Sequence, residues 1–376
     1  MLYLDHAATS PIRPEALEAM APSLTRDFGN PSSHHTVGEA AAYALDDARA
    51  RVARVLGFRA GDVVFTAGGT EADNLAVKGI VLAALARGRS HVVTTPIEHE
   101  AILESVAYLG RFHDVTATLV PTDAHGRVDP AAIAAALRPE TALVAVGHAN
   151  NEIGTVQDVP GIVAAAQGVP VHVDAVQSAG WLDVSGLGAD SLAIAGHKLG
   201  APKGIGALAV RGRVPLEPLL HGGGQERGRR SGTENVAGAV ALATALELAD
   251  GERVAVAERV GAQTARLIAA VLAAVPRAAL TGDPIHRLPG TAGFTFDGVS
   301  GEAVLLELER RGVVSSSGSA CAAGSDEPSH VLLACGVPPG LAQTSVRLTL
   351  GRQGLPGDGP ERLAALVAAS VAAVTS

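Results

Sequence analysis

Between about residues 60 and 210, short apolar runs alternate with stretches of helical character, and this alternation constrains the fold more than any other feature. We interpret the apolar runs as strands at residues 63–65, 91–94, 115–120, 143–146, 171–173, 191–195 and 205–210, with helices at about 71–86 and from about 98. Strands that alternate with helices predict a mostly parallel sheet covered on both faces. In such sheets, ligands bind at the carboxyl ends of the strands.

The chain after residue 210 predicts a second, smaller unit. A long helical stretch at about 235–275 is followed by strand-like runs at 292–296 and 345–350 and by helices at 301–311 and 361–374. We therefore predict an α/β protein with a large domain at residues 15–255 and a small α+β domain formed by residues 1–14 and 256–376. A chain of 376 residues is long enough for both.

Composition excludes several classes of protein. The 47% of hydrophobic residues predict a buried core and argue against a disordered chain. The net charge of −9 and the lack of a basic run argue against nucleic-acid binding. The apolar runs are too short to cross a membrane, and the first residues lack a secretory signal. Two cysteines predict a reducing, cytoplasmic environment and no disulfide framework, and we predict no metal site.

Lysine is scarce in this chain. The 29 basic residues include only three lysines, Lys78, Lys198 and Lys203. A lysine that remains in an arginine-rich chain can mark a place where a primary amine is needed, because a guanidinium cannot form a Schiff base. Composition alone leaves open that these three lysines have no special role.

Three strand ends carry polar residues suited to chemistry. Gly69 and Thr70 open a helix and suit a phosphate, although by themselves they are better explained by an ordinary turn capped by Thr70. Asp174 ends an apolar strand, where it suits a pyridinium nitrogen, a helix cap or a salt bridge. Lys198 follows another strand, where its amine is either desolvated and nucleophilic or an ordinary surface group.

The two cysteines lie in contrasting surroundings. Cys321 lies in a run of small residues, 315–325, which predicts a mobile, exposed loop and a nucleophilic thiol. Cys335 ends an apolar helical stretch, which predicts a core residue.

Ten short motifs together are more specific than any one of them. They are 3–9 (Tyr-Leu-Asp-His-Ala-Ala-Thr), 28–33 (Phe-Gly-Asn-Pro-Ser-Ser), 70–74 (Thr-Glu-Ala-Asp-Asn), 98–99 (Glu-His), 150–154 (Asn-Asn-Glu-Ile-Gly), 172–174 (His-Val-Asp), 196–198 (Gly-His-Lys), 230–233 (Arg-Ser-Gly-Thr), 316–321 (Ser-Ser-Gly-Ser-Ala-Cys) and 346–348 (Val-Arg-Leu). In order and spacing, the chain resembles the cysteine desulfurases of the class V aminotransferase family, which supply sulfur to iron–sulfur clusters and to thiolation pathways.

The resemblance implies the type I fold of enzymes that use pyridoxal 5′-phosphate (PLP). Lys198 would bind the cofactor aldehyde covalently, Asp174 would pair with the ring nitrogen, and Gln177 would hydrogen-bond the ring oxygen. His99 would stack on the ring and could move protons. The residues implied for the phosphate are Gly69, Thr70, His197 and, from the neighbouring subunit of a homodimer, Thr233.

The resemblance also implies L-cysteine as substrate and a persulfide on Cys321. Arg347 and Asn151 would hold the substrate carboxylate, because a planar guanidinium matches two oxygens. The stretch 322–326 is followed by Glu-Pro-Ser at 327–329. This segment resembles the long loop that, in some relatives, carries the cysteine to a sulfur-acceptor protein. The acceptor stays open between a cluster scaffold, a tRNA-modifying enzyme and a cofactor pathway.

One position departs from the family pattern, and other functions remain as alternatives. Ala195 stands where many relatives have a Ser or Thr that contacts the phosphate, so PLP affinity is open. The nearest alternative is a selenocysteine lyase or another class V lyase or aminotransferase. A non-catalytic sulfur-transfer or scaffold subunit is the alternative from another class, and the complete set of Lys198, Asp174, His99, Arg347 and Cys321 argues against it.

Overall fold

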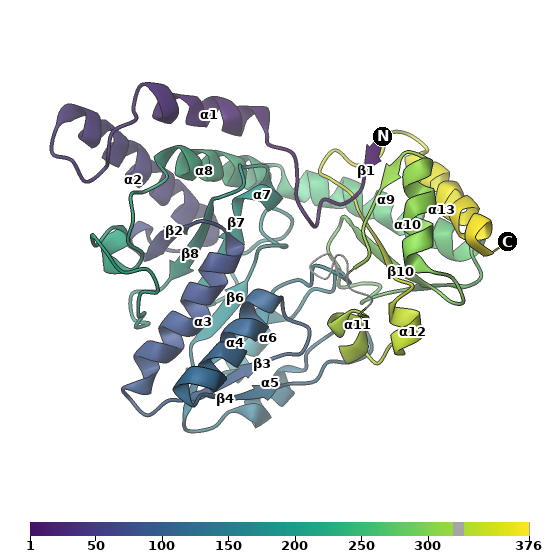
Figure 1. Cartoon of the computed structure of the whole chain (residues 1–376), viewed down its shortest axis with the longest axis horizontal. Helices are drawn as coiled ribbons and strands as arrows, with labels where there is room; N and C mark the ends of the chain where they lie inside the picture. Colours follow the sequence, from purple (N-terminus) through teal and green to yellow (C-terminus); the bar gives the residue numbers. More distant parts are fainter. Residues whose placement is uncertain (319–326, 376) are drawn as a thin grey trace.

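A seven-stranded sheet forms the centre of the larger part of the molecule in this computed structural model, which describes residues 1–318 and 327–375 (Figure 1). Its strand order is β2-β8-β7-β6-β5-β3-β4. The bounds are β2 Val63–Thr66, β3 His91–Thr94, β4 Thr116–Leu119, β5 Thr141–Gly147, β6 Val171–Asp174, β7 Ser191–Ala195 and β8 Gly206–Val210. Of the seven strands, β8 alone runs opposite to the others, so the predicted, mostly parallel sheet is confirmed.

Helices cover both faces of this sheet. The core on one face includes apolar side chains of α3 Gly69–Leu85 and α4 Glu100–His113. The core on the other face includes apolar side chains of α2, α5, α6 and α8. The remaining helices of the large unit are α1 Pro14–Thr25, α2 Thr36–Leu56, α5 Pro130–Ala136, α6 Val159–Ala165, α7 Gly196–Leu199 and α8 Val236–Gly251. Strands β5, β6 and β7 are buried on both faces of the sheet. A ligand can therefore reach them only where the strands end.

The second unit has a separate core, built around two small sheets. Antiparallel β12 Val346–Thr349, β10 Thr291–Phe296 and β9 Ala278–Leu280 form one sheet, and parallel β1 Leu2–Tyr3 and β11 Val313–Val314 form the other. The helices of this part are α9 Arg253–Ala274, α10 Gly301–Arg310, α11 His330–Ala334, α12 Pro339–Ala342 and α13 Gly359–Thr375. This core contains Leu4 from the N-terminal segment, and its other buried members start at Val256 in the sequence. That distribution supports the proposed domain boundary near residue 255.

The long helix expected at about 235–275 is in fact two helices. α8 ends at Gly251 and α9 begins at Arg253, so the chain turns at Glu252. The carboxylate of Glu252 pairs with Arg13 and, at 3.1 Å, with Arg352. These ion pairs join the turn to both ends of the chain. In the described ranges, no helix combines the length and apolarity needed to cross a membrane.

Candidate active site

Most of the predicted site residues line a single cavity of about 350 Å³ at the carboxyl ends of β5, β6 and β7. These residues are Gly69, Thr70, His99, Asn151, Asp174, Gln177, His197, Lys198 and Arg347. A larger cavity of about 660 Å³ lies beyond the N-terminal segment and shares Ala7, Gln177 and Lys198 with the first. Only the smaller cavity brings Lys198 together with Asp174 and Arg347, so we take it as the candidate site.

Lys198 is half-buried, and its side chain lines the cavity. The buried strand β7 ends at Ala195, and α7 then places the Lys198 side chain in the cavity. Its ammonium Nζ donates to the carbonyl oxygen of Ala7 and, at 2.9 Å, to that of Ala8. This position favours the interpretation of Lys198 as a nucleophilic amine over that of an ordinary surface lysine.

Asp174 lies at the last position of β6 and is held by the backbone that follows it. The amide of Val176 donates to Asp174 Oδ1 at 2.8 Å. Burial raises the pKa of Asp174, while the nearby charges of His99 and Lys198 and the Val176 amide favour the ionised carboxylate. The side-chain amide of Gln177 donates to the Ala7 carbonyl at 3.0 Å. The carboxylate therefore faces a cavity that contains an amine.

The turn between β2 and α3 forms one end of the cavity. A Cβ atom on Gly69 would lie 2.7 Å from Val176 Cγ2 and 3.3 Å from the Ala195 methyl, so only glycine leaves this space open. The N-cap of α3 is Gly68, which corrects the alternative that Thr70 caps this helix. The first amides of a helix attract anions. This end of the cavity therefore suits a phosphate.

Two histidines of the cavity have defined surroundings. Burial and the charges of Lys198 and Lys203 lower the pKa of His197 to about 4, so its ring is neutral at pH 7. His99 is the N-cap of α4, and its Nδ1 accepts a hydrogen bond from the Ala101 amide at 3.1 Å. A neutral His99 ring therefore carries its proton on Nε2.

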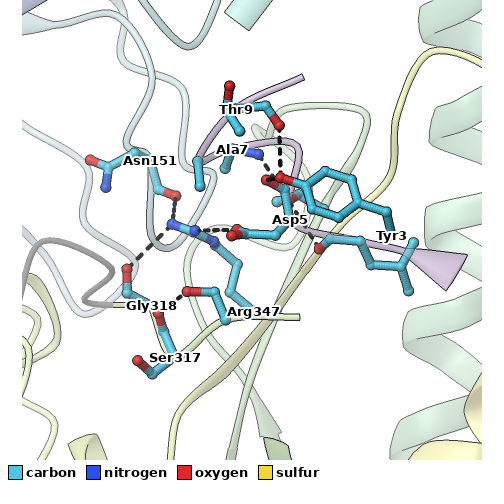
Figure 2. A network of polar contacts seen from close by, with 12 residues as sticks. Tyr3, Asp5, Ala7, Thr9, Asn151, Ser317, Gly318 and Arg347 are labelled. Carbon is cyan, nitrogen blue, oxygen red and sulfur yellow. Dashed lines mark hydrogen bonds and ion pairs between the residues drawn. The ribbon is translucent and has the colours of Figure 1, made fainter. Parts of the chain in front are cut away.

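Arg347 forms the wall of the cavity contributed by the second unit (Figure 2). The side chain is almost fully buried, and its Nη2 pairs with Asp5 Oδ1 at 2.8 Å. Its Nη1 donates to the carbonyl oxygens of Asn151 at 2.7 Å and Gly318 at 3.3 Å. Among the described residues, nothing accepts a hydrogen bond from its enclosed Nε. One donor of the guanidinium is thus left for another acceptor.

The two neighbouring asparagines have different roles. The side chain of Asn150 donates to the Ile97 carbonyl at 2.8 Å and accepts from the amides of Glu152 and Ile153, so it shapes the turn. Asn151 exposes part of its side chain to the cavity. Both residues line the cavity, but the side chain of Asn150 is already engaged with the backbone, so Asn151 stays the candidate for a ligand.

Sequence reasoning missed three carboxyl groups at or beside the cavity. Asp73 and Glu98 line it, and Asp5 holds Arg347. Glu98 Oε2 accepts from the Gly147 amide at 2.6 Å, and burial raises the pKa of Glu98 to about 8. All three residues lie in the motifs quoted above, but their spacing in sequence gives no sign that they meet around one cavity.

One predicted residue does not line this cavity, another lies outside the described residues, and the second cysteine is buried. Thr233 is exposed and lies elsewhere on its own chain. Cys321 lies outside the described residues. Cys335 is buried, and burial raises the pKa of its thiol to about 11, so it is a poor nucleophile at neutral pH.

Comparison with known proteins gives a consistent result. The aminotransferase class-V family model matches residues 2–353. The chain is 44% identical to "Cysteine desulfurase IscS" of Methanosarcina thermophila, covering 93% of this chain and 87% of that protein. It is 46% identical to "IscS-like cysteine desulfurase" of Mycobacterium tuberculosis, covering 95% and 93%.

Solved structures agree with these relatives. A "NIFS-LIKE PROTEIN" superposes with a TM-score of 0.91 at 31% identity, over 99% of both chains. A structure described as "SspA in complex with cysteine" gives a TM-score of 0.79 at 33% identity, over 93% of this chain and 99% of that one.

Proposed function

Because this chain belongs to the cysteine desulfurases of the class V aminotransferase family, we propose that it uses PLP at Lys198 to move sulfur from L-cysteine to Cys321. The products are L-alanine and a persulfide on the protein. The observation that carries this proposal is that a half-buried lysine amine, a strand-end carboxylate and a buried arginine line the same cavity.

The residues present fit PLP. The cavity offers Lys198 Nζ for the aldehyde and Asp174 for the ring nitrogen, and the space kept open by Gly69 lies at the start of α3, where a phosphate is favoured. Gln177 would meet the ring oxygen and His99 the ring face. Thr70 and His197 would join Gly69 at the phosphate. Bound PLP supplies an electron sink for the charge left when the substrate loses its α-proton.

The substrate carboxylate is assigned to Arg347 and Asn151. Arg347 lines the cavity, and its planar guanidinium has a shape that suits a carboxylate. Asp5 holds the guanidinium at fixed orientation through the 2.8 Å ion pair. His99 or the Lys198 amine accepts the α-proton, since both line the same cavity.

The sulfur step needs one thiolate and one proton donor. The Cys321 thiolate attacks the substrate sulfur, the bond between that sulfur and the substrate Cβ breaks, and the electron pair stays on carbon. A proton then completes the methyl group of alanine, and the sulfur remains on Cys321 as a persulfide. The cationic Arg347 would favour the thiolate over the thiol.

The active unit is proposed to be a homodimer with shared sites. Thr233 is exposed on its own chain, as a residue that serves the partner's phosphate site would be. Large apolar side chains are exposed on α1 and α2, at one edge of the large unit, and in the loops beside them (Figure 1): Leu17, Leu24, Phe28, Val37, Tyr43 and Leu220. Exposed apolar groups of this kind suit burial against a second copy. Sedimentation equilibrium should give the mass of two chains.

The persulfide sulfur then passes to an acceptor protein. The candidate pathways for that protein are iron–sulfur cluster assembly and thiolation. With two cysteines and no disulfide framework, the proposed compartment is the reducing cytoplasm.

The test is to incubate the purified protein with L-cysteine and PLP, quantify alanine, and map persulfide by mass spectrometry. We expect equal amounts of alanine and protein-bound sulfur in the first turnover, with the sulfur on Cys321. Cys321→Ser should abolish both while PLP stays bound, and Cys335→Ser is the matched control that should retain both. Full activity of Cys321→Ser would refute the assignment, and preference for selenocysteine would support the lyase alternative.

A further inference from the structure

A second carboxyl group lines the floor of the cavity beside Asp174. Asp73 lies on α3, is 2% exposed, and lines the cavity together with Asp174. His172 and Asp174 lie two residues apart on β6, so their side chains leave the same face of the sheet, which is the face that α3 covers. The two carboxyl groups therefore approach each other from facing elements.

His172 joins Asp73 to the sheet. Its Nε2 lies 3.1 Å from Asp73 Oδ1, and its Nδ1 lies 3.0 Å from Ser191 Oγ on β7. Among the described residues, His172 is the only hydrogen-bond partner of the Asp73 carboxyl group. The ring is fully buried, and burial lowers its pKa to about 3, so His172 is neutral at pH 7.

Two ionised carboxylates on this floor would be costly. Burial is the main cause that raises the pKa of Asp73 well above its ordinary value, and the charges of Asp174 and Glu98 add to it. Asp174, in contrast, faces the charges of His99 and Lys198 and receives the Val176 amide hydrogen bond. Of the two, Asp174 has the partners that a negative charge requires.

We propose that Asp73 is a positioning residue that stays protonated and donates a hydrogen bond to neutral His172, so that Asp174 alone carries the carboxylate charge at the floor. This inference rests on the proposed function, because the partner assigned to Asp174 is the ring nitrogen of PLP. A neutral imidazole has one donor and one acceptor nitrogen. The proposal therefore assigns the proton of His172 to Nδ1, which would donate to the Ser191 hydroxyl, and leaves Nε2 to accept from Asp73.

The test compares Asp73→Asn and Asp73→Ala with the parent in the PLP-loaded enzyme. Asparagine is neutral and has nearly the same shape, and its amide N–H can donate to His172. We therefore expect Asp73→Asn to keep the midpoint of the pH titration followed by the visible absorption of bound PLP. Asp73→Ala removes the donor and leaves a buried acceptor unpaired, so PLP should bind roughly tenfold more weakly.

Two results would overturn the inference. A midpoint moved by about one pH unit or more in Asp73→Asn would mean that the parent carries a charge at this position. An Asp73→Ala variant equal to the parent in PLP affinity and titration would mean that the group positions nothing.

Urea unfolding of the purified chain provides a second measurement that does not depend on PLP. A buried Asp73 with a raised pKa stabilises the fold fully only below the unfolded value of about 3.9, and this contribution is lost as pH rises. The unfolding free energy of Asp73→Asn minus that of the parent should therefore increase from pH 5 to pH 8. A decrease of this difference over the same range would contradict the protonated state. Absence of a visible band in the parent would instead refute the proposed function, and the unfolding comparison would still decide the state of Asp73.

Discussion

The cavity has two walls of different origin. On the large-unit wall, Asp174 ends β6 and Lys198 follows β7, and the parallel sheet brings the ends of these adjacent strands to one edge. On the small-unit wall, Arg347 lies on an antiparallel strand and pairs with Asp5, 342 residues away in the chain. The first wall follows from the topology of one sheet, whereas the second requires two units and the N-terminal segment to come together.

The N-terminal segment connects the two walls. The Ala7 carbonyl accepts hydrogen bonds from Lys198 and Gln177, and Asp5 holds Arg347. In the proposed function, the large-unit wall binds the cofactor and the small-unit wall binds the substrate. Changes on one wall should therefore leave the ligand of the other wall largely unaffected, and the predictions below test that separation.

The largest effect is expected for Lys198→Ala on the large-unit wall. Loss of the amine should abolish the visible absorption of protein-bound PLP and lower kcat by about 10³-fold or more. Absorption spectra and alanine production measure both. Lys203→Ala is the matched control and should resemble the parent. A band that persists in Lys198→Ala would exclude this residue as the anchor.

Arg347→Lys should affect the opposite wall. It keeps the positive charge but loses the planar fork that contacts Asp5 and Asn151 and that we propose for the substrate carboxylate. The value of kcat/KM for cysteine should therefore fall about 30-fold or more, which corresponds to roughly 2 kcal/mol. The PLP absorption should be unchanged. Steady-state kinetics combined with spectra separate these readouts, and loss of PLP would show that the two walls are not independent.

Acid should destabilise the large-unit wall through His148. This side chain lies behind the wall, with Nδ1 3.0 Å from Ser178 Oγ, and burial lowers its pKa to about 4. A histidine with a lowered folded pKa stabilises the fold fully above the unfolded value of about 6.5, and that contribution is lost as pH falls toward 4. The expected loss is about 2–3 kcal/mol of unfolding free energy.

Urea unfolding at pH 7 and pH 4.5 would measure this loss. His148→Gln should show a smaller change between the two pH values than the parent. The exposed His34→Gln provides the control and should match the parent. If His148→Gln lost as much unfolding free energy between pH 7 and pH 4.5 as the parent, His148 would not be the cause of the loss.

The smallest effect is expected from adding a hydroxyl group to the large-unit wall. Ala195 lines the cavity beside Gly69, at the position where the family resemblance leads us to expect Ser or Thr. Ala195→Ser should tighten PLP binding by roughly 0.5–1.5 kcal/mol, which is about two- to tenfold. Fluorescence titration of the apoenzyme with PLP would measure the change. Weaker binding would mean that the hydroxyl group does not reach the phosphate.

The large-unit wall was largely predictable, because its residues follow a local pattern. The run 191–195 is β7 residue for residue, and Lys198 lies where a strand-end group should. The break at Glu252 was not predictable, since an apolar period continues through it and the ion pairs that stabilise the turn involve Arg13 and Arg352. α2 was also missed, although Leu45, Ala48, Val52 and Leu56 have helical spacing.

The small-unit wall was predictable only through the family resemblance. Nothing local to Arg347 shows that it reaches a cavity, because its partners Asp5 and Asn151 come from distant segments. Asp73 and Glu98 illustrate the same limit. A carboxyl group on a helix or at a strand end is ordinary in sequence, and it becomes functional only through the groups that face it across the fold.

Reduction of the PLP-loaded enzyme with borohydride, followed by peptide mass spectrometry, tests the central claim most directly. The chain has only three lysines, and the account predicts the pyridoxyl phosphate adduct on Lys198, with Lys78 and Lys203 unmodified. An adduct on either of the other two lysines, with Lys198 unmodified, would contradict the account.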